Sequence, residues 1–300
     1  MITENVLSAV DKTGEVMKVL TYYNIFRHPM RIDEIHKLLS FQCRLDELEH
    51  ILNALCQEKK IFFILHHYAL SDNDEMVLHK IKGEEAAAVM LPKAGKAGLW
   101  LSRFPFVRFV GISGSLSKQY ADKNTDFDFF IITAPKRLWV ARTILHLFKK
   151  LTFITGSQKF FCMNYFIDEN NLTFEDRNIF VLNELATLIP VNNYALYRTM
   201  LESNAWAMQQ LPQFEWQLEP KHEKRSIVKL ISESVLNLLP MNVINKSMMN
   251  FTDKRWKRKW AKAGYPMEDY DLAFRTREGI SKNHPRNHQK IIMNKFSEYL

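Results

Sequence analysis

Cysteine, glycine and long apolar runs are all scarce in this sequence. Its three cysteines, Cys43, Cys56 and Cys162, are scattered and match neither a disulfide framework nor a zinc site, so a reducing cytoplasm is the expected location. Only 9 glycines occur in 300 residues, and no internal repeat or low-complexity segment is visible. No stretch of about 18 uncharged apolar residues occurs, and no basic segment followed by an apolar run opens the chain. We therefore expect no membrane span and no signal peptide.

The composition is that of a basic chain with enough apolar residues for two or three packed domains. Hydrophobic residues make up 47% of the sequence. Lysine and arginine number 41 against 33 acidic residues, so the formal net charge is 41 − 33 = +8. Such a charge suits an anionic partner, for example a nucleotide, a nucleic acid or an acidic membrane face. It is equally consistent with an ordinary basic soluble protein.

The segment between Arg108 and Thr133 carries the strongest chemical signal. An apolar run ends at Gly114 and Ser115, where the chain is expected to turn from a strand into a short helix. Glycine at such a turn lets the backbone approach a ligand closely, and the amides that follow face outward from the start of the helix. This arrangement predicts a cradle for a polyphosphate.

A second strand is expected to follow, and it carries two aspartates. Asp126 and Asp128 are two residues apart, so on a strand both carboxylates leave the same face. Phe127 and Phe129 alternate with them and should enter the core. Because hard divalent cations prefer oxygen ligands, the two carboxylates predict a shared Mg²⁺ or Mn²⁺ site.

Roughly Phe104–Asp168 resembles the DNA polymerase β-like nucleotidyltransferase superfamily. The resemblance lies in the order of the elements: a strand, a Gly-Ser turn, a short helix, and a second strand that carries D-x-D. The resemblance implies that the Gly114–Ser115 turn holds a nucleoside triphosphate. Lys118 and Arg142 are further candidates for phosphate contacts, and spacing alone does not select either. The resemblance also implies that Asp126 and Asp128 bind Mg²⁺. The implied reaction moves a nucleoside monophosphate from an NTP to the hydroxyl of an acceptor that the sequence does not identify, and releases pyrophosphate.

A third carboxylate, usual in this family, has no clear counterpart here. The later strand, expected over Lys159–Asp168, offers Asn164 at its centre, and an amide cannot act as a general base. Asp168 lies on the same expected face but about 13 Å further along, at ~3.3 Å per residue. Asn164 and Asp168 are therefore the candidates for the third position. The alternative function is a catalytically degenerate nucleotide-binding regulator or scaffold.

The chain upstream of the motif predicts a separate winged-helix-like module over residues 1–82. Three helices are expected at Val6–Tyr23, Arg31–Leu39 and Leu45–Glu58, followed by a hairpin of Lys60–Leu65 and His67–Ser71. The third helix is rich in acidic residues and would repel phosphates, so a protein-docking role is favoured over DNA binding.

The remaining chain divides into a nucleotidyltransferase core at 83–176 and a helical C-terminal region at 177–300, which makes the whole fold α+β. A helix over Gly83–Phe104, broken at Pro92, should pack beside the first strand, and the resemblance implies that Glu184–Trp206 closes over base and acceptor. The basic run Lys254–Trp260 contains two tryptophans. It fits either an anionic membrane or nucleic-acid surface, or a solvated helix that buries both rings.

Overall fold

The computed structural model describes residues 11–152, 154, 156, 160–216 and 226–299. The start of the helix expected from Val6 and the first residue of the strand expected from Lys159 lie outside these ranges. The fold is mixed α+β and 56% helical, with a six-stranded mixed sheet and a small antiparallel one. The chain forms two compact units, which we call the N-terminal unit (Met1–Ile81, Trp206–Glu215 and Asn294–Leu300) and the sheet unit (Lys82–Ala205 and Trp216–Met293).

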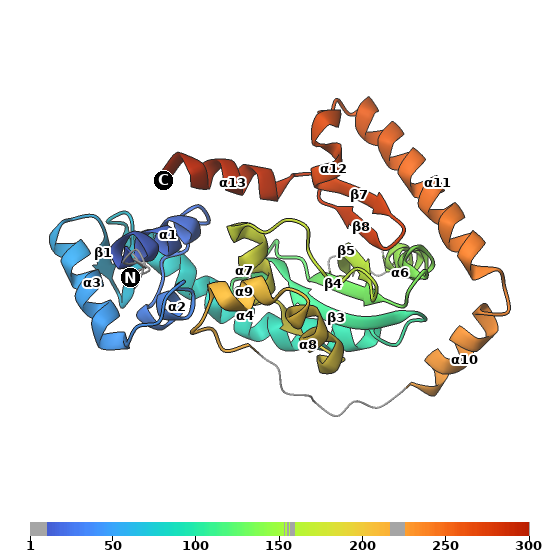
Figure 1. Ribbon diagram of the computed structural model, residues 1–300, viewed down its shortest axis with the longest axis horizontal. Coiled ribbons are helices and arrows are strands. Elements are labelled where there is room, and N and C mark those ends of the chain that lie inside the picture. The colour runs from blue at the N-terminus through green and yellow to red at the C-terminus, as the bar shows by residue number, and fades with distance from the viewer. Residues whose placement is uncertain (1–10, 153, 155, 157–159, 217–225, 300) are drawn as a thin grey trace, which may run out of the picture. The chain divides into compact units, whose positions relative to one another are not determined.

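The N-terminal unit begins with three helices and a hairpin (Figure 1). These elements are α1 (Lys12–Asn24), α2 (Ile32–Lys37), α3 (Leu45–Gln57), β1 (Phe62–Ile64) and β2 (His67–Ala69). Leu48, Leu52 and Leu55 form the buried stripe of α3, as their helical spacing predicts. Met30, between α1 and α2, forms an isolated antiparallel bridge with Tyr68 of β2, which ties the hairpin to the helices.

The sheet unit is built on six strands in the order β6-β3-β4-β5-β8-β7. These strands are β3 (Val107–Ser113), β4 (Asp128–Thr133), β5 (Cys162–Asp168), β6 (Ile189–Pro190), β7 (Phe274–Arg277) and β8 (Ile280–Asn283). Only β4 and β5 are parallel, and the crossover between them is α6 (Leu138–Leu151). The other helices are α4 (Asp74–Leu101), α5 (Gly114–Ser117), α7 (Ile179–Thr187), α8 (Tyr194–Glu202), α9 (Ala205–Gln210), α10 (Ile227–Leu236), α11 (Met241–Lys262), the 3₁₀ turn η2 (Met267–Asp269), α12 (Tyr270–Ala273) and α13 (His288–Tyr299).

Helix α4 continues through Pro92, so the expected break at this residue is wrong. A proline inside a helix removes one hydrogen bond at a cost of about 3 kcal/mol. Here Pro92 is exposed, so water can hydrate the carbonyl that lost its partner. Ala87, Ala94 and Leu101 recur every seven residues and are buried in the main core, and their packing offsets the cost.

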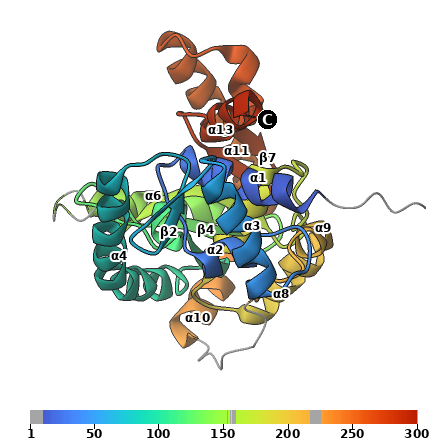
Figure 2. The ribbon, with the colours of Figure 1, turned by 90° about the vertical axis from the view of Figure 1, so that its left-hand side faces the viewer.

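The two faces of the sheet have different surroundings. Phe127 and Phe129 enter the main core, as the sequence predicts, together with Phe166 of β5 and Trp139 of α6. The alternate residues of β4 leave the opposite face, which α7 covers in part. Figure 2 shows α4 and α6 together with β4 from a second direction. Asp128 therefore lies on the face opposite the main core.

The region after 177 is not purely helical, in contrast to the expectation. β7 and β8 form a hairpin whose second strand pairs with β5, and β6 pairs with β3 at the other edge. These strands are two to four residues long, so they carry no readable alternation of their own. In α11, Trp256 is buried against Tyr270 and Phe274, which confirms the buried-ring alternative for that tryptophan.

Among the described residues, no single helix has both the length and the apolar character needed to cross a membrane. Helices α10 and α11 taken together have that length and apolar character, although a bend of 89° separates them.

Candidate functional site

The Gly114 turn lies directly against Asp128. β3 ends at Ser113, which pairs with Asp128 across the β3–β4 ladder, and α5 starts at the next residue. Gly114 has φ of +73°, a conformation that favours glycine. A Cβ atom there would lie 2.6 Å from Oδ2 of Asp128, well inside van der Waals contact. Both the backbone conformation and the close approach therefore require glycine at this position.

The two aspartates differ in their surroundings. Asp128 is the first residue of β4 and is mostly buried, whereas Asp126 is exposed in the loop before the strand. The expectation that one strand carries both aspartates is therefore wrong for Asp126, because β4 begins two residues later. Burial raises the pKa of Asp128 to about 6, against a hydrogen bond with Cys162 that lowers it. The negative charges of Asp126 and Glu184 raise this pKa further. A cation bound between these carboxylates would offset both the desolvation of Asp128 and the repulsion from Asp126 and Glu184.

Residue Cys162, rather than an acid, stands beside Asp128 on the neighbouring strand. The two residues are register partners between β4 and β5. Burial raises the pKa of the Cys162 thiol to about 11, and the charge of Asp128 adds to this. The thiol is therefore neutral at physiological pH and can donate a hydrogen bond to the carboxylate. Asn164 donates from Nδ2 to the Cys162 sulfur at 3.0 Å.

A bulge at Asn164 changes which residues of β5 share a face. The register shifts by one residue between Phe129 and Phe130 of β4, so Tyr165, and not Asn164, pairs with Phe130. After the bulge, Phe166 turns into the main core. The expected face of Asn164, Phe166 and Asp168 is therefore interrupted.

Asp168 lies far from the Gly-Ser turn and has structural partners. It pairs with Thr133, at the opposite end of β4 from Asp128. Its side chain accepts hydrogen bonds from the amides of Asn170 and Lys136, at 3.1 and 3.2 Å, and from the side chain of Asn171 at 2.6 Å. These bonds close the turn after β5, so the structure does not bring Asp168 to the aspartate pair.

Glu184 of α7 is the carboxylate that the sequence did not single out. Its Oε1 is 2.7 Å from Nζ of Lys118, and its negative charge raises the pKa of Asp128. Lys118 Nζ also donates to the Gly114 carbonyl at 3.3 Å. The proposed phosphate ligand Lys118 is thus at the turn, but paired with Glu184. Ser115, the other predicted phosphate ligand, is exposed at the same turn.

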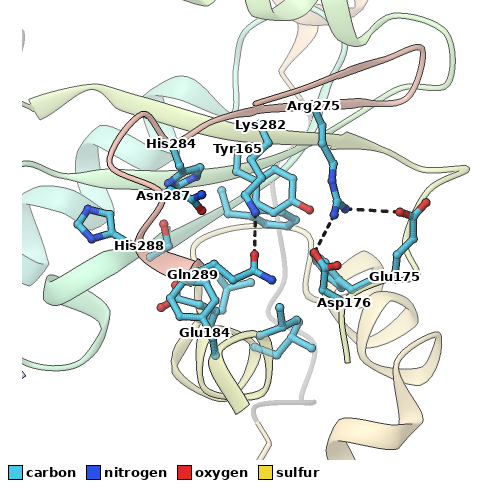
Figure 3. A pocket seen from close by; sticks show the side chains of 17 residues that line it. Tyr165, Glu175, Asp176, Glu184, Arg275, Lys282, His284, Asn287, His288 and Gln289 are labelled. Carbon is cyan, nitrogen blue, oxygen red and sulfur yellow. Dashed lines mark hydrogen bonds and ion pairs between the residues drawn. The ribbon is translucent and has the colours of Figure 1, made fainter. Parts of the chain in front are cut away.

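A cavity of about 100 Å³ opens on the same face of the sheet (Figure 3). Ser113 and Glu184 line it, and Ser113 is the residue that precedes the Gly-Ser turn and pairs with Asp128. Phe130 and Tyr165 form part of its apolar wall, with their rings 5.4 Å apart. Figure 3 shows side chains from β5, β7, β8 and α7 converging on this space. An aromatic wall with a polar rim is the kind of lining found in small-molecule sites, whose volumes are usually about 300–1,000 Å³. The smaller volume here suits one small group of a ligand.

The far side of the cavity carries two cationic groups. Arg275 is paired with Asp176 at 2.9 Å. Lys282 is buried, and its Nζ donates to Oε1 of Gln289 at 2.8 Å. Burial lowers the pKa of Lys282 to about 8, and the charge of Arg275 lowers it further. Since its hydrogen-bond partner is neutral, Lys282 is suited to receive a negative or strongly polar group of a ligand.

The donor set fits Mg²⁺ that arrives with a nucleotide. Within the described ranges, no three His, Cys, Asp or Glu side chains are grouped closely enough to form a complete metal site. Mg²⁺, however, is commonly held by one or two carboxylates, with water and substrate phosphates completing its shell. Asp126 and Asp128 can supply those two carboxylates.

Comparison of the chain with protein-family models, with curated proteins and with solved structures gave no match. Function is therefore inferred from the site itself.

Proposed function

We propose that this protein is an Mg²⁺-dependent nucleotidyltransferase, which moves a nucleoside monophosphate from an NTP to an acceptor hydroxyl and releases pyrophosphate. The observation that supports this most strongly is the contact of Gly114 with Asp128. It joins a turn suited to phosphates to a carboxylate suited to a cation, within one strand pair. The order of these groups along the chain also resembles the DNA polymerase β-like superfamily.

Each group then has a chemical role. Asp126 and Asp128 would hold the Mg²⁺, and the chemistry supplied by such an ion is neutralisation of the triphosphate charge and polarisation of the α-phosphate. The turn at Gly114 and Ser115 admits the phosphates close to the backbone. Lys118 exchanges its contact with Glu184 for one with a phosphate oxygen, which leaves Glu184 available.

Glu184 is the group best placed to act as general base. It lies at the boundary between the cavity and the aspartates, where neither Asn164 nor Asp168 stands. In this role, its carboxylate takes the proton of the acceptor hydroxyl. The acceptor oxygen forms a bond to the α-phosphorus, and the bond from that phosphorus to pyrophosphate breaks. The cavity lined by Phe130 and Tyr165 receives the acceptor.

A nucleotide-binding regulator is the second candidate. It is favoured by the thiol of Cys162 beside Asp128 and by the structural bonds of Asp168, which leave β5 without a free acid near the site. In either case we propose that the three helices and hairpin of the N-terminal unit are a winged-helix-like docking module. Helix α3 carries acidic residues, which suits a protein partner better than DNA.

Calorimetric titration of each of the four NTPs, with and without Mg²⁺, tests the proposal. We expect binding that requires both the triphosphate and Mg²⁺, and its loss in a variant with Asp126→Asn and Asp128→Asn. A matched control is Asp72→Asn with Asp74→Asn, because these exposed acids have the same spacing in the N-terminal unit. Unchanged binding in the Asp126 and Asp128 variant would refute the site.

Turnover separates the two candidates. An enzyme releases pyrophosphate from Mg²⁺-NTP in the presence of an acceptor, and Glu184→Gln should lower that rate while binding persists. Mg²⁺-dependent binding without pyrophosphate release, across panels of sugars, small alcohols, proteins and RNA, would support the regulator.

A further inference from the structure

Helix α10 is oriented with its charged residues inward. Lys229 donates from Nζ to the carbonyl of Ser102 at 3.0 Å. Glu233 accepts a hydrogen bond from the amide of Phe106 at 2.6 Å and pairs with Arg108 at 2.8 Å. These contacts anchor α10 to the sheet unit through polar groups. The opposite face of the helix is consequently the one that meets solvent.

Aliphatic side chains make up most of that outer face, with Ser234 as the exposed polar residue among them. No residue of α10 is buried, and both views place the helix at the periphery of the sheet unit (Figures 1 and 2). We define the apolar ridge as the large aliphatic residues that are 52–84% exposed in α10, in the turn after it and in the first turn of α11: Ile227, Val228, Leu230, Ile231, Val235, Leu238, Leu239 and Val243. Single exposed apolar residues are ordinary, but contiguous ones on one surface usually mark an interaction site.

Basic groups border the ridge where α10 gives way to α11. Arg137 donates to the side chains of Asn237 and Asn242, at 3.3 and 2.7 Å, so its guanidinium lies at this corner. Lys136 and Lys246 line a hollow of about 380 Å³ that also includes Val243 of the ridge. Glu278 is the one acid in that lining, and the other residues are neutral.

An apolar ridge edged by cations matches the surface of an anionic membrane. Helices that lie in the plane of a membrane place aliphatic residues among the acyl chains and basic residues at the phosphates. The formal net charge of +8 adds long-range attraction to such a surface.

We propose that the apolar ridge inserts shallowly into an anionic membrane, with Lys136, Arg137 and Lys246 contacting lipid phosphates. This surface is separate from the groups assigned to nucleotide transfer, so either proposal can fail without the other. The protein would then act as a peripheral membrane protein that works at the lipid surface.

Co-sedimentation of the full chain with lipid vesicles tests this. We expect binding to phosphatidylcholine vesicles that contain phosphatidylserine, and weaker binding to phosphatidylcholine alone. Ile231→Glu with Val235→Glu should abolish binding, because both positions are exposed on the ridge. Lys136→Ala with Lys246→Ala should weaken binding to the anionic vesicles, by about fivefold for each lysine.

Leu147→Glu with Leu151→Glu provides the matched control. These residues of α6 are also exposed and four apart, but they lie outside the ridge. This variant should bind vesicles like the wild type. Failure of the wild type to bind anionic vesicles, or equal binding by the ridge variant, would overturn the proposal. So would sedimentation velocity that shows a wild-type dimer and a monomeric ridge variant, since the ridge would then join two copies.

Discussion

Replacement of Gly114 by alanine tests the link between the turn and the aspartate. Gly114 has φ of +73°, and an added Cβ would meet Oδ2 of Asp128 at 2.6 Å and its Cβ and Cγ at 3.2 Å. The substitution therefore does two things. It strains the backbone, and it pushes the side chain of Asp128 away from the turn.

The size of each effect can be separated with a second glycine. A left-handed conformation costs a residue with a Cβ about 1–2 kcal/mol. Gly264, after α11, has φ of +70° with no atom within 4 Å of an added Cβ, so Gly264→Ala carries the strain alone. Displacement of Asp128 in Gly114→Ala also disturbs its hydrogen bond with Cys162, at a further cost of about 1 kcal/mol. We expect a loss of stability of about 2–3 kcal/mol for Gly114→Ala.

Urea unfolding and calorimetric titration with Mg²⁺-NTP measure the two consequences. Gly264→Ala should lower the free energy of unfolding but leave nucleotide affinity unchanged. Gly114→Ala should lower both, with affinity reduced at least about tenfold, a change of about 1.4 kcal/mol. Wild-type affinity in Gly114→Ala would show that the contact with Asp128 does not form the nucleotide site.

Three further predictions concern stability. Burial lowers the pKa of His146 to about 3 and that of His284 to about 4, whereas histidines in the unfolded chain bind a proton near pH 6.5. The free energy of unfolding should therefore fall as the pH drops from about 6.5 towards 4. The expected slope is about 1.4 kcal/mol per pH unit for each histidine. Replacing either with glutamine should flatten the slope seen in urea unfolding across this range, and an unchanged slope would count against its burial as a neutral ring. Glu34→Gln should lower the free energy of unfolding by about 3 kcal/mol in the same assay, because it removes the carboxylate that pairs with the buried ammonium group of Lys80. If the ion pair is the cause, the double variant with Lys80→Met should recover most of that loss. Glu233→Ala should raise the rate of proteolysis within α10, because it removes the contacts with the Phe106 amide and Arg108, and an unchanged rate would mean that other contacts hold the helix.

The local sequence pattern was sufficient to predict those parts of the candidate site whose residues are close together in the chain. Period-2 alternation placed Phe127 and Phe129 in the core, and Asp128 followed on the other face. The Gly-Ser turn was readable because glycine supplies the positive φ found at Gly114. The same reasoning located the helices of the N-terminal unit, whose apolar residues recur at helical spacing.

Side chains that the fold brings together from distant segments of the chain could not be predicted from local pattern. Glu184 reaches Lys118 from a helix 66 residues further along the chain, and Lys282 enters the cavity from a hairpin too short to show a pattern. A bulge at Asn164 moved Phe166 and Asp168 away from the expected face, because one inserted residue reverses the sides of a strand. Likewise, the residue types in α10 do not reveal which side faces solvent.

The sequence by itself determined the strand, turn and strand that carry Gly114 and Asp128, because strand alternation and backbone conformation depend on neighbouring residues. Only the tertiary structure decided that Glu184 and Cys162 surround Asp128, that Asp168 closes a turn, and that α10 exposes its apolar side. Each of these depends on packing between segments far apart in the chain, and such packing is set by the shape and burial of the whole unit.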